Sequence, residues 1–153
     1  MKFVILLILS VMFTGITLNT YGISVDEIHD SALEYMNAQE FVQAIQEYSK
    51  ILEVEPMDET ALINRAFAFT MINDYESAIE DYDRILENDP GNLIATKGKA
   101  TILAQFECES YNNCRPNEAL ELLDVALENN PNDEDLKMKR DYLLAISEQF
   151  DIQ

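Results

Sequence analysis

Apolar residues recur at helical spacing along most of the chain. Ile28, Ala32 and Tyr35 follow one another at intervals of four and then three positions, which is the stripe of an amphipathic helix. A short and mostly polar segment, 37–40, comes next. A second apolar stripe follows it and consists of Phe41, Ala44, Ile45, Tyr48 and Ile51. The pattern predicts two antiparallel helices joined by a tight turn.

The same pattern returns with a 34-residue period. Ala32 aligns with Ala66 and Ala100, and Pro56 aligns with Pro90. A third copy resumes after a short insertion within its middle turn. Positions that keep the register in the first two copies include Tyr35/Phe69, Phe41/Tyr75, Ala44/Ala78, Tyr48/Tyr82 and Ile51/Ile85. A fixed period of this length is typical of a stacked array of helical hairpins.

Helix-breaking and helix-capping residues mark the borders of the copies. Pro56 stops the second helix, and Asp58 is placed to cap the helix that follows. In the second copy, Asn73 and Asp74 make the inner turn, and residues 90–92 (Pro-Gly-Asn) make the outer turn.

These motifs resemble the tetratricopeptide repeat (TPR), over residues 25–131. The resemblance implies an all-α fold, a right-handed TPR superhelix of three antiparallel helix pairs. The units lie at about 25–58, 59–92 and 93–133. The match is most specific in the second half of each unit, and the usual tryptophan of the family is absent.

A last helix is expected over 134–150. Its apolar residues include Leu136 and Leu143, whereas Lys137, Arg140 and Asp141 stand where a further repeat would have apolar or small residues. We therefore predict a capping helix with a polar back, which a stacked array needs at an open end.

The N-terminal segment, 1–22, differs from the rest of the chain. Lys2 precedes an apolar run, 3–13, and small and polar residues follow up to Gly22, which is the layout of a secretory signal. We expect export, to the extracellular space, periplasm or cell envelope, with a TPR domain over 23–153. An uncleaved membrane anchor through residues 3–18 is the alternative, although this run is short for a bilayer span.

The charge excludes several partners. The chain carries 29 acidic and 10 basic residues, for a net charge of −19. Such a chain does not neutralise phosphates, so nucleic acid is not its main partner, and an anionic membrane surface would repel it. Its 48% of hydrophobic residues nevertheless supports a folded core.

Cys108 and Cys114 are the only cysteines, and both lie within the insertion of the third unit. An even count in an exported chain favours a disulfide that pins the lengthened turn. Free thiols remain the main alternative. A metal site is disfavoured because two thiolates without a nearby histidine do not complete a tetrahedral set.

The sequence offers no catalytic constellation. His29, the one histidine, has no serine or cysteine partner at a recognisable spacing, and there is no glycine-rich phosphate loop. We expect no enzyme activity, no cofactor and no metal. Acidic pairs such as Asp81 and Asp83 are interpreted as solvated faces of helices.

The TPR resemblance implies that the first helix of each pair lines a concave face. On that face we expect an apolar groove with Asp26 as its one acid, while most of the acids lie on the outer second helices. The groove is predicted to bind a protein or peptide. Its expected residues are His29, Leu33, Met36, Asn37, Ile63, Phe67, Thr70, Met71, Ile94, Lys97 and Thr101. Alternatively, some of these side chains pack against one another or under the last helix.

TPRs that grip an acidic C-terminus use Lys, Asn and Arg at set positions. Asn64 fits this pattern, but Leu33, Ile94 and Gly98 do not, so this mode is disfavoured. The lysines and arginines near 97–99 and 137–140 are interpreted mainly as partners of neighbouring acids, with a small acidic-ligand contact as the alternative.

The predicted function is thus a non-catalytic, exported interaction module. The alternative is an assembly subunit of a membrane or cell-envelope complex, held by an uncleaved N-terminal segment.

Overall fold

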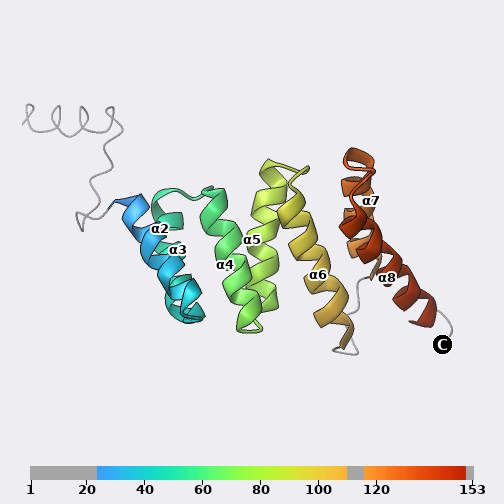
Figure 1. Cartoon of the computed structure of the whole chain (residues 1–153), viewed down its shortest axis with the longest axis horizontal. Coiled ribbons are helices and arrows are strands. Elements are labelled where there is room, and N and C mark those ends of the chain that lie inside the picture. The colour runs from blue at the N-terminus through green and yellow to red at the C-terminus, as the bar shows by residue number, and fades with distance from the viewer. Residues whose placement is uncertain (1–23, 110–115, 151–153) are drawn as a thin grey trace, which may run out of the picture.

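The computed structural model describes residues 24–109 and 116–150, and these residues form a row of seven helices in antiparallel succession (Figure 1). Each helix packs against the next one along the chain. The helices are α2 (Val25–Asn37), α3 (Phe41–Val54), α4 (Glu59–Met71), α5 (Tyr75–Asn88), α6 (Leu93–Glu109), α7 (Pro116–Asn129) and α8 (Glu134–Phe150). The all-α array of three helix pairs and a last helix is confirmed.

Side-chain caps begin several helices. Ser24 and Glu27 form a reciprocal capping box at the start of α2. The amide of Ala61 donates to Asp58 Oδ1 at 2.7 Å, so the predicted cap of α4 is confirmed. These caps satisfy amides that have no partner inside the helix, and they fix where each helix begins.

The inner turns of the first two pairs are built alike. Gln39 has a φ of 60°, and Asn73, at the same position of the next repeat, has a φ of 64°. The residue after each of them bonds back to the first helix of its pair. The amide of Glu40 donates to Tyr35 O, and the amide of Asp74 donates to Phe69 O, both at 2.9 Å. A left-handed residue at the same place in both copies gives the two hairpins the same geometry.

Small residues let the helices approach closely. Ala32, Ala66 and Ala100 are almost completely buried, as their repeated spacing predicts. Gly98 marks a very close approach of α6 to α5, since a Cβ atom built there would lie 2.4 Å from the ring of Tyr82 on α5. The core therefore depends on small side chains as much as on large ones.

A basic residue at one repeated position of α4, α6 and α8 ties successive pairs together. Arg65 donates to Ser49 on α3 at 2.9 Å, and Lys99 donates to Asp83 on α5 at 2.7 Å. In the last helix Arg140 pairs with Asp124 on α7. The two partners have the same sequence separation in all three contacts, so an inter-repeat contact recurs in register.

The prediction that Asp81 lies on a solvated face is wrong. Its exposed fraction is 2%, and Arg65 holds it in a bidentate pair, with Nε to Oδ2 at 2.7 Å and Nη2 to Oδ1 at 2.6 Å. The guanidinium also lies over the ring of Phe69, 5.6 Å from its centroid. Asp81 is buried because α4 covers its face of α5.

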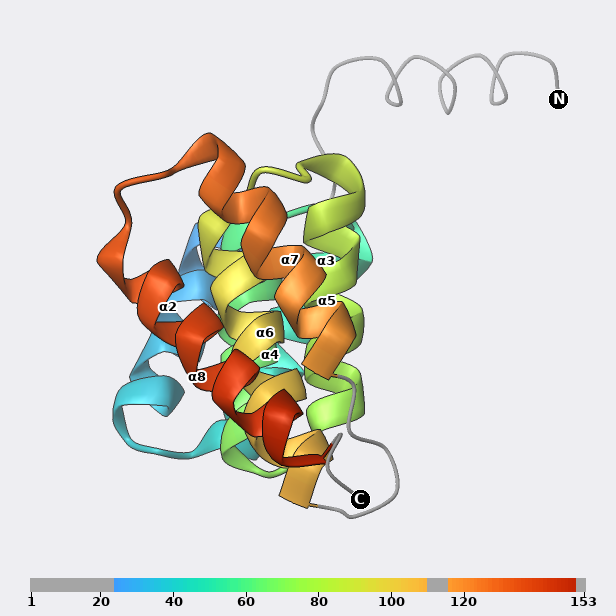
Figure 2. The same cartoon turned by 90° about the vertical axis from the view of Figure 1, so that its right-hand side faces the viewer.

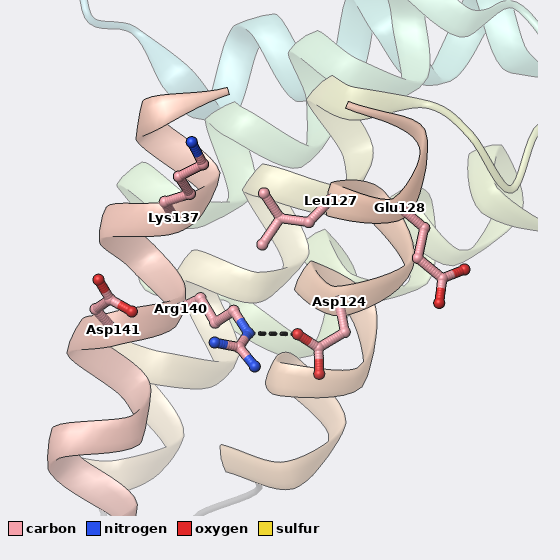
Figure 3. Close-up of a pocket in the computed structure, with 6 residues that line it drawn as sticks. All are labelled: Asp124, Leu127, Glu128, Lys137, Arg140 and Asp141. Atoms are coloured by element: carbon pink, nitrogen blue, oxygen red, sulfur yellow. Dashed lines mark hydrogen bonds and ion pairs between the residues drawn. The ribbon is translucent and has the colours of Figure 1, made fainter. Parts of the chain in front are cut away.

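The α8 helix closes the array as a cap. Leu136 and Leu143 are buried against the preceding pair, and Figure 2 shows α7 and α8 together at this end of the molecule. Between these two helices lies a hollow of about 560 Å³ (Figure 3). Its lining is mainly charged and consists of Asp124, Leu127, Glu128, Lys137, Arg140 and Asp141. A polar end of this kind does not continue the apolar stacking.

Candidate functional site: the face of the first helices

The first helices of successive pairs line one side of the array. In addition to the helices next to it along the chain, α4 contacts α6, and α6 likewise contacts α8. The residues of the predicted groove come from α2, α4 and α6. The candidate site is therefore a surface shared by several helices rather than a pocket within one of them.

Four apolar side chains of this face are widely exposed. The exposed fraction is 51% for Leu33, 48% for Phe67, 49% for Met71 and 57% for Ile94. They come from α2, α4 and α6, so all three units contribute to the exposed apolar surface. We call Leu33, Phe67, Met71 and Ile94 the exposed row; they are the large apolar residues of the predicted groove that are exposed to solvent.

Several other predicted groove residues make contacts within the array itself. Met36 and Ile63 are half-buried and pack against the core. The hydroxyl of Thr70 donates to Ala66 O at 2.9 Å, and that of Thr101 donates to Lys97 O at 2.7 Å. Asn37 is exposed at the end of α2. The expectation that some of these side chains pack internally applies to Met36 and Ile63.

His29 forms part of a hollow of about 450 Å³ at the α2 end of the face. Its Nε2 lies 3.2 Å from Asp58 Oδ2, and its ring meets Tyr48 edge to face, with the centroids 6.2 Å apart. Burial raises the pKa of Tyr48, while its hydrogen bond with Asn64 acts in the opposite direction. The hollow is lined by Asp26, His29, Asp30, Leu33, Tyr48, Thr60 and Asn64.

Lys97 is paired within the array. Its Nζ lies 2.9 Å from Asp133 Oδ2 and 3.1 Å from Asp135 Oδ2, at the start of α8. The hydrogen bond that Lys97 donates to Asp133 raises the pKa of Lys97, and the same bond lowers the pKa of Asp133. Lys97 therefore fastens α8 to α6.

The other cations at this end are also occupied. Lys99 contacts Asp83 at 2.7 Å and Glu118 at 2.9 Å, while Lys139 donates to the hydroxyl of Thr101 at 3.1 Å. Burial alone would lower the pKa of Lys99, but hydrogen bonds to the two carboxylates outweigh it and leave the pKa above 10.5. These contacts support the interpretation of this cluster as partners of nearby acids, except that Lys139 binds a hydroxyl.

Two residues of α8 extend the exposed row and were absent from the predicted groove. Met138 is 66% exposed and Tyr142 is 54% exposed. The number of residues from Lys97 to Met138, and from Thr101 to Tyr142, is the same as that between corresponding residues of α5 and α7, which lie on either side of the insertion. Continuing the register into the last helix would have identified both residues.

Asp30 was missed as well. Only Asp26 was expected as an acid of the groove, yet Asp30 lines the same hollow beside Leu33. One turn of helix separates the two aspartates, so both reach the space between α2 and α4. Their four-residue spacing in the sequence already indicates that both aspartates lie on the same face of α2.

Cys108 and Cys114 lie outside the residues whose side chains the structure describes, so the disulfide stays a prediction. Within 24–109 and 116–150, the structure has no group of three or more His, Cys, Asp or Glu side chains arranged to hold a metal ion. In the same residues, none of the helices combines the length and the apolar character that a membrane crossing requires.

Comparison with known proteins gives matches among solved structures alone. No family model and no curated protein matches the chain. The TPR domain of Sgt2 from Aspergillus fumigatus superimposes with a TM-score of 0.67 at 23% identity, over 84% of this chain and 82% of that one. The TPR2B domain of yeast Sti1, in complex with pHsp70, gives 0.64 at 25% identity, over 79% and 96%.

A tetratricopeptide repeat protein from Parabacteroides merdae is also similar. Its TM-score is 0.64 at 21% identity, over 82% of this chain, which spans 46% of that longer protein. The chain therefore has the fold of tetratricopeptide repeat proteins, as its 34-residue period predicts.

Proposed function

We propose that the chain is a non-catalytic protein-interaction module that binds a segment of a partner protein across its first helices. The exposed side chains of Leu33, Phe67, Met71 and Ile94 carry this proposal, because several exposed apolar side chains on one face of a strongly charged protein usually mark an interaction site. The yeast Sti1 domain, which shares the fold, is in a complex with pHsp70, and this supports the same use of the fold here.

The geometry suits a long and narrow ligand. The exposed residues come from α2, α4 and α6, so a partner helix or an extended strand that lies across these helices would meet an apolar anchor on each of them. Met71 has an unbranched, adaptable side chain that fits ligands of varied shape. This mode of binding needs no proton transfer and no bound group.

The test is a pair of substitutions at the middle of the row. Phe67→Asp together with Met71→Asp places two carboxylates where the partner would bury apolar surface. Both residues are about half exposed, so the array should keep its helical signal and its melting temperature. Affinity capture of partners should fall by at least about tenfold, since each buried apolar side chain contributes about 1.5–3 kcal/mol.

Val42→Asp is the matched control. Val42 is 54% exposed but lies on α3, a second helix. Capture that is equally strong with the double variant, or equally weakened by Val42→Asp, would contradict binding at the first helices.

We also propose that the module is exported and works outside the cytoplasm. The basic, apolar and small-residue order of residues 1–22 supports this location. Mass spectrometry of the native N-terminus tests it: a start near residue 23 is expected after cleavage. A chain that keeps residues 1–22 in a membrane fraction would favour the anchored assembly subunit instead.

A further inference from the structure

We propose that the partner segment is basic, with apolar anchors for the exposed row and a lysine or arginine that enters the hollow beside α2. This inference rests on the proposed function and names the chemistry of its ligand. It follows from the charges around the row, which differ from one end of the site to the other.

The α2 end of the site is acidic and uncompensated. Asp26 and Asp30 are both exposed and line the same hollow as Leu33, and neither carboxylate pairs with a cation among the described residues. A ligand cation in this hollow would therefore meet two carboxylates beside an apolar contact.

The described basic residues nearest in sequence are engaged elsewhere. His29, which also lines the hollow, contacts Asp58 at 3.2 Å. Lys50 pairs with Glu47 at 2.7 Å on its own helix. Arg65 is held by Asp81, and Arg84 donates to Pro56 O and also approaches Asp81. The array therefore supplies no internal cation for the hollow from these described residues, and a ligand can supply one.

The other end of the site does not favour an acidic ligand. Lys97 lies between Asp133 and Asp135, and an incoming carboxylate would have to displace one of them. The net charge of −19 adds a long-range field that attracts basic segments and repels acidic ones. Both the local pairs and the overall field favour a cationic partner.

The hollow can hold the long side chain of such a ligand. Its volume of about 450 Å³ exceeds that of a lysine or arginine side chain, and its lining also offers the polar groups of Thr60 and Asn64. The stem of the ligand side chain would lie along Leu33 while its charged group reaches the carboxylates.

Selection from a library of random displayed peptides on the full chain tests the proposal. Selected peptides should combine apolar residues with an excess of lysine and arginine over the unselected library. Their affinity should weaken steeply as salt is raised. Peptides that are enriched in aspartate and glutamate, or that have no charge bias, would overturn the inference.

A local variant separates the hollow from the general charge. Asp26→Asn with Asp30→Asn should weaken a selected peptide by about fivefold, as expected for two exposed ion pairs. Glu80→Gln with Glu87→Gln removes the same charge from exposed positions of α5 and should change the affinity much less. Equal effects of the two double variants would overturn the assignment to the hollow.

The selection also distinguishes this inference from the proposed function. Suppose that the selected peptides are neutral or acidic and that the Phe67→Asp, Met71→Asp variant no longer binds them. This outcome would support binding at the first helices and contradict only the preference for basic ligands. If no peptide depends on these two residues, both proposals fail. A concentration-dependent dimer that is lost in the same variant would assign the row to a second copy of the chain, against the inference.

Discussion

The contacts of Arg65 and Arg140 differ although the two residues occupy the same position in the repeat. Arg65 lies between α3 and α5, where it meets Ser49 on one side and buried Asp81 on the other. Arg140 meets Asp124 on α7, and among the described residues no further helix pair lies beyond it. The side chains of Arg65 and Asp81 are 17% and 3% exposed, against 37% and 52% for Arg140 and Asp124.

The comparison shows that the position of an ion pair in the helix array, more than its residue types, decides how much the pair contributes to stability. Between two layers, removal of one partner leaves a charge buried without compensation. At the open end, water replaces the lost partner and screens the remaining charge. The same register position is thus structural inside the array and nearly neutral at its end.

The largest expected effect is that of Asp81→Ala. Arg65, whose side chain is only 17% exposed, would lose its bidentate partner, so the free energy of unfolding should fall by about 3–5 kcal/mol. Asp124→Ala at the open end should cost less than about 1 kcal/mol, since its pair with Arg140 is exposed. Urea denaturation of both variants measures the difference, and equal losses would break the comparison.

Gly98→Ala should have an intermediate effect. The new Cβ would lie 2.4 Å from the ring of Tyr82, which is only 5% exposed, so either the ring or the two helices must shift. We expect a loss of about 1–3 kcal/mol, as for other overpacked cores. Helix propensity predicts the opposite sign, a gain of about 1 kcal/mol. Thermal unfolding decides between them, and a higher melting temperature would show that the contact relaxes freely.

The smallest effect concerns the attachment of α8 and depends on pH. The hydrogen bond from Lys97 holds the pKa of Asp133 below 3.8, so this carboxylate stabilises the fold above that pH and loses its contribution as the pH falls below it. Asp133 also caps α8, because its Oδ1 accepts a hydrogen bond from the amide of Leu136 at 3.1 Å, and Asp133→Asn keeps a good helix cap but removes the charge. The melting temperature of the variant should therefore fall less between about pH 6 and about pH 3 than that of the unchanged protein. Parallel acid profiles would contradict this role of Asp133.

Repetition made the fold predictable from the sequence. Ala32, Ala66 and Ala100 return in phase and are all buried, and Asp58 caps α4 as its place after Pro56 predicts. These features depend on local geometry that is the same in each unit, so one copy predicts the next.

The site was predictable only in part. Exposure of Leu33 and Phe67 followed from the register, whereas the burial of Asp81 did not, because it depends on a guanidinium from a neighbouring helix. Met138 was missed because the polar back of α8 concealed that its other face keeps the register. Periodicity identifies the face of a helix, but the charges of the next layer decide which side chains remain available.

The chain of neighbour-to-neighbour helix contacts also bears on how the molecule forms and fails. Helices pack chiefly on those adjacent in sequence, so the average loop that must close during folding is short, and short loops allow fast folding. A terminal unit contacts the rest of the array on one side only, so it should unfold before the middle units do. Amide hydrogen exchange would then rise from α4 and α5 toward the ends, and a pulling force would release the helices in steps.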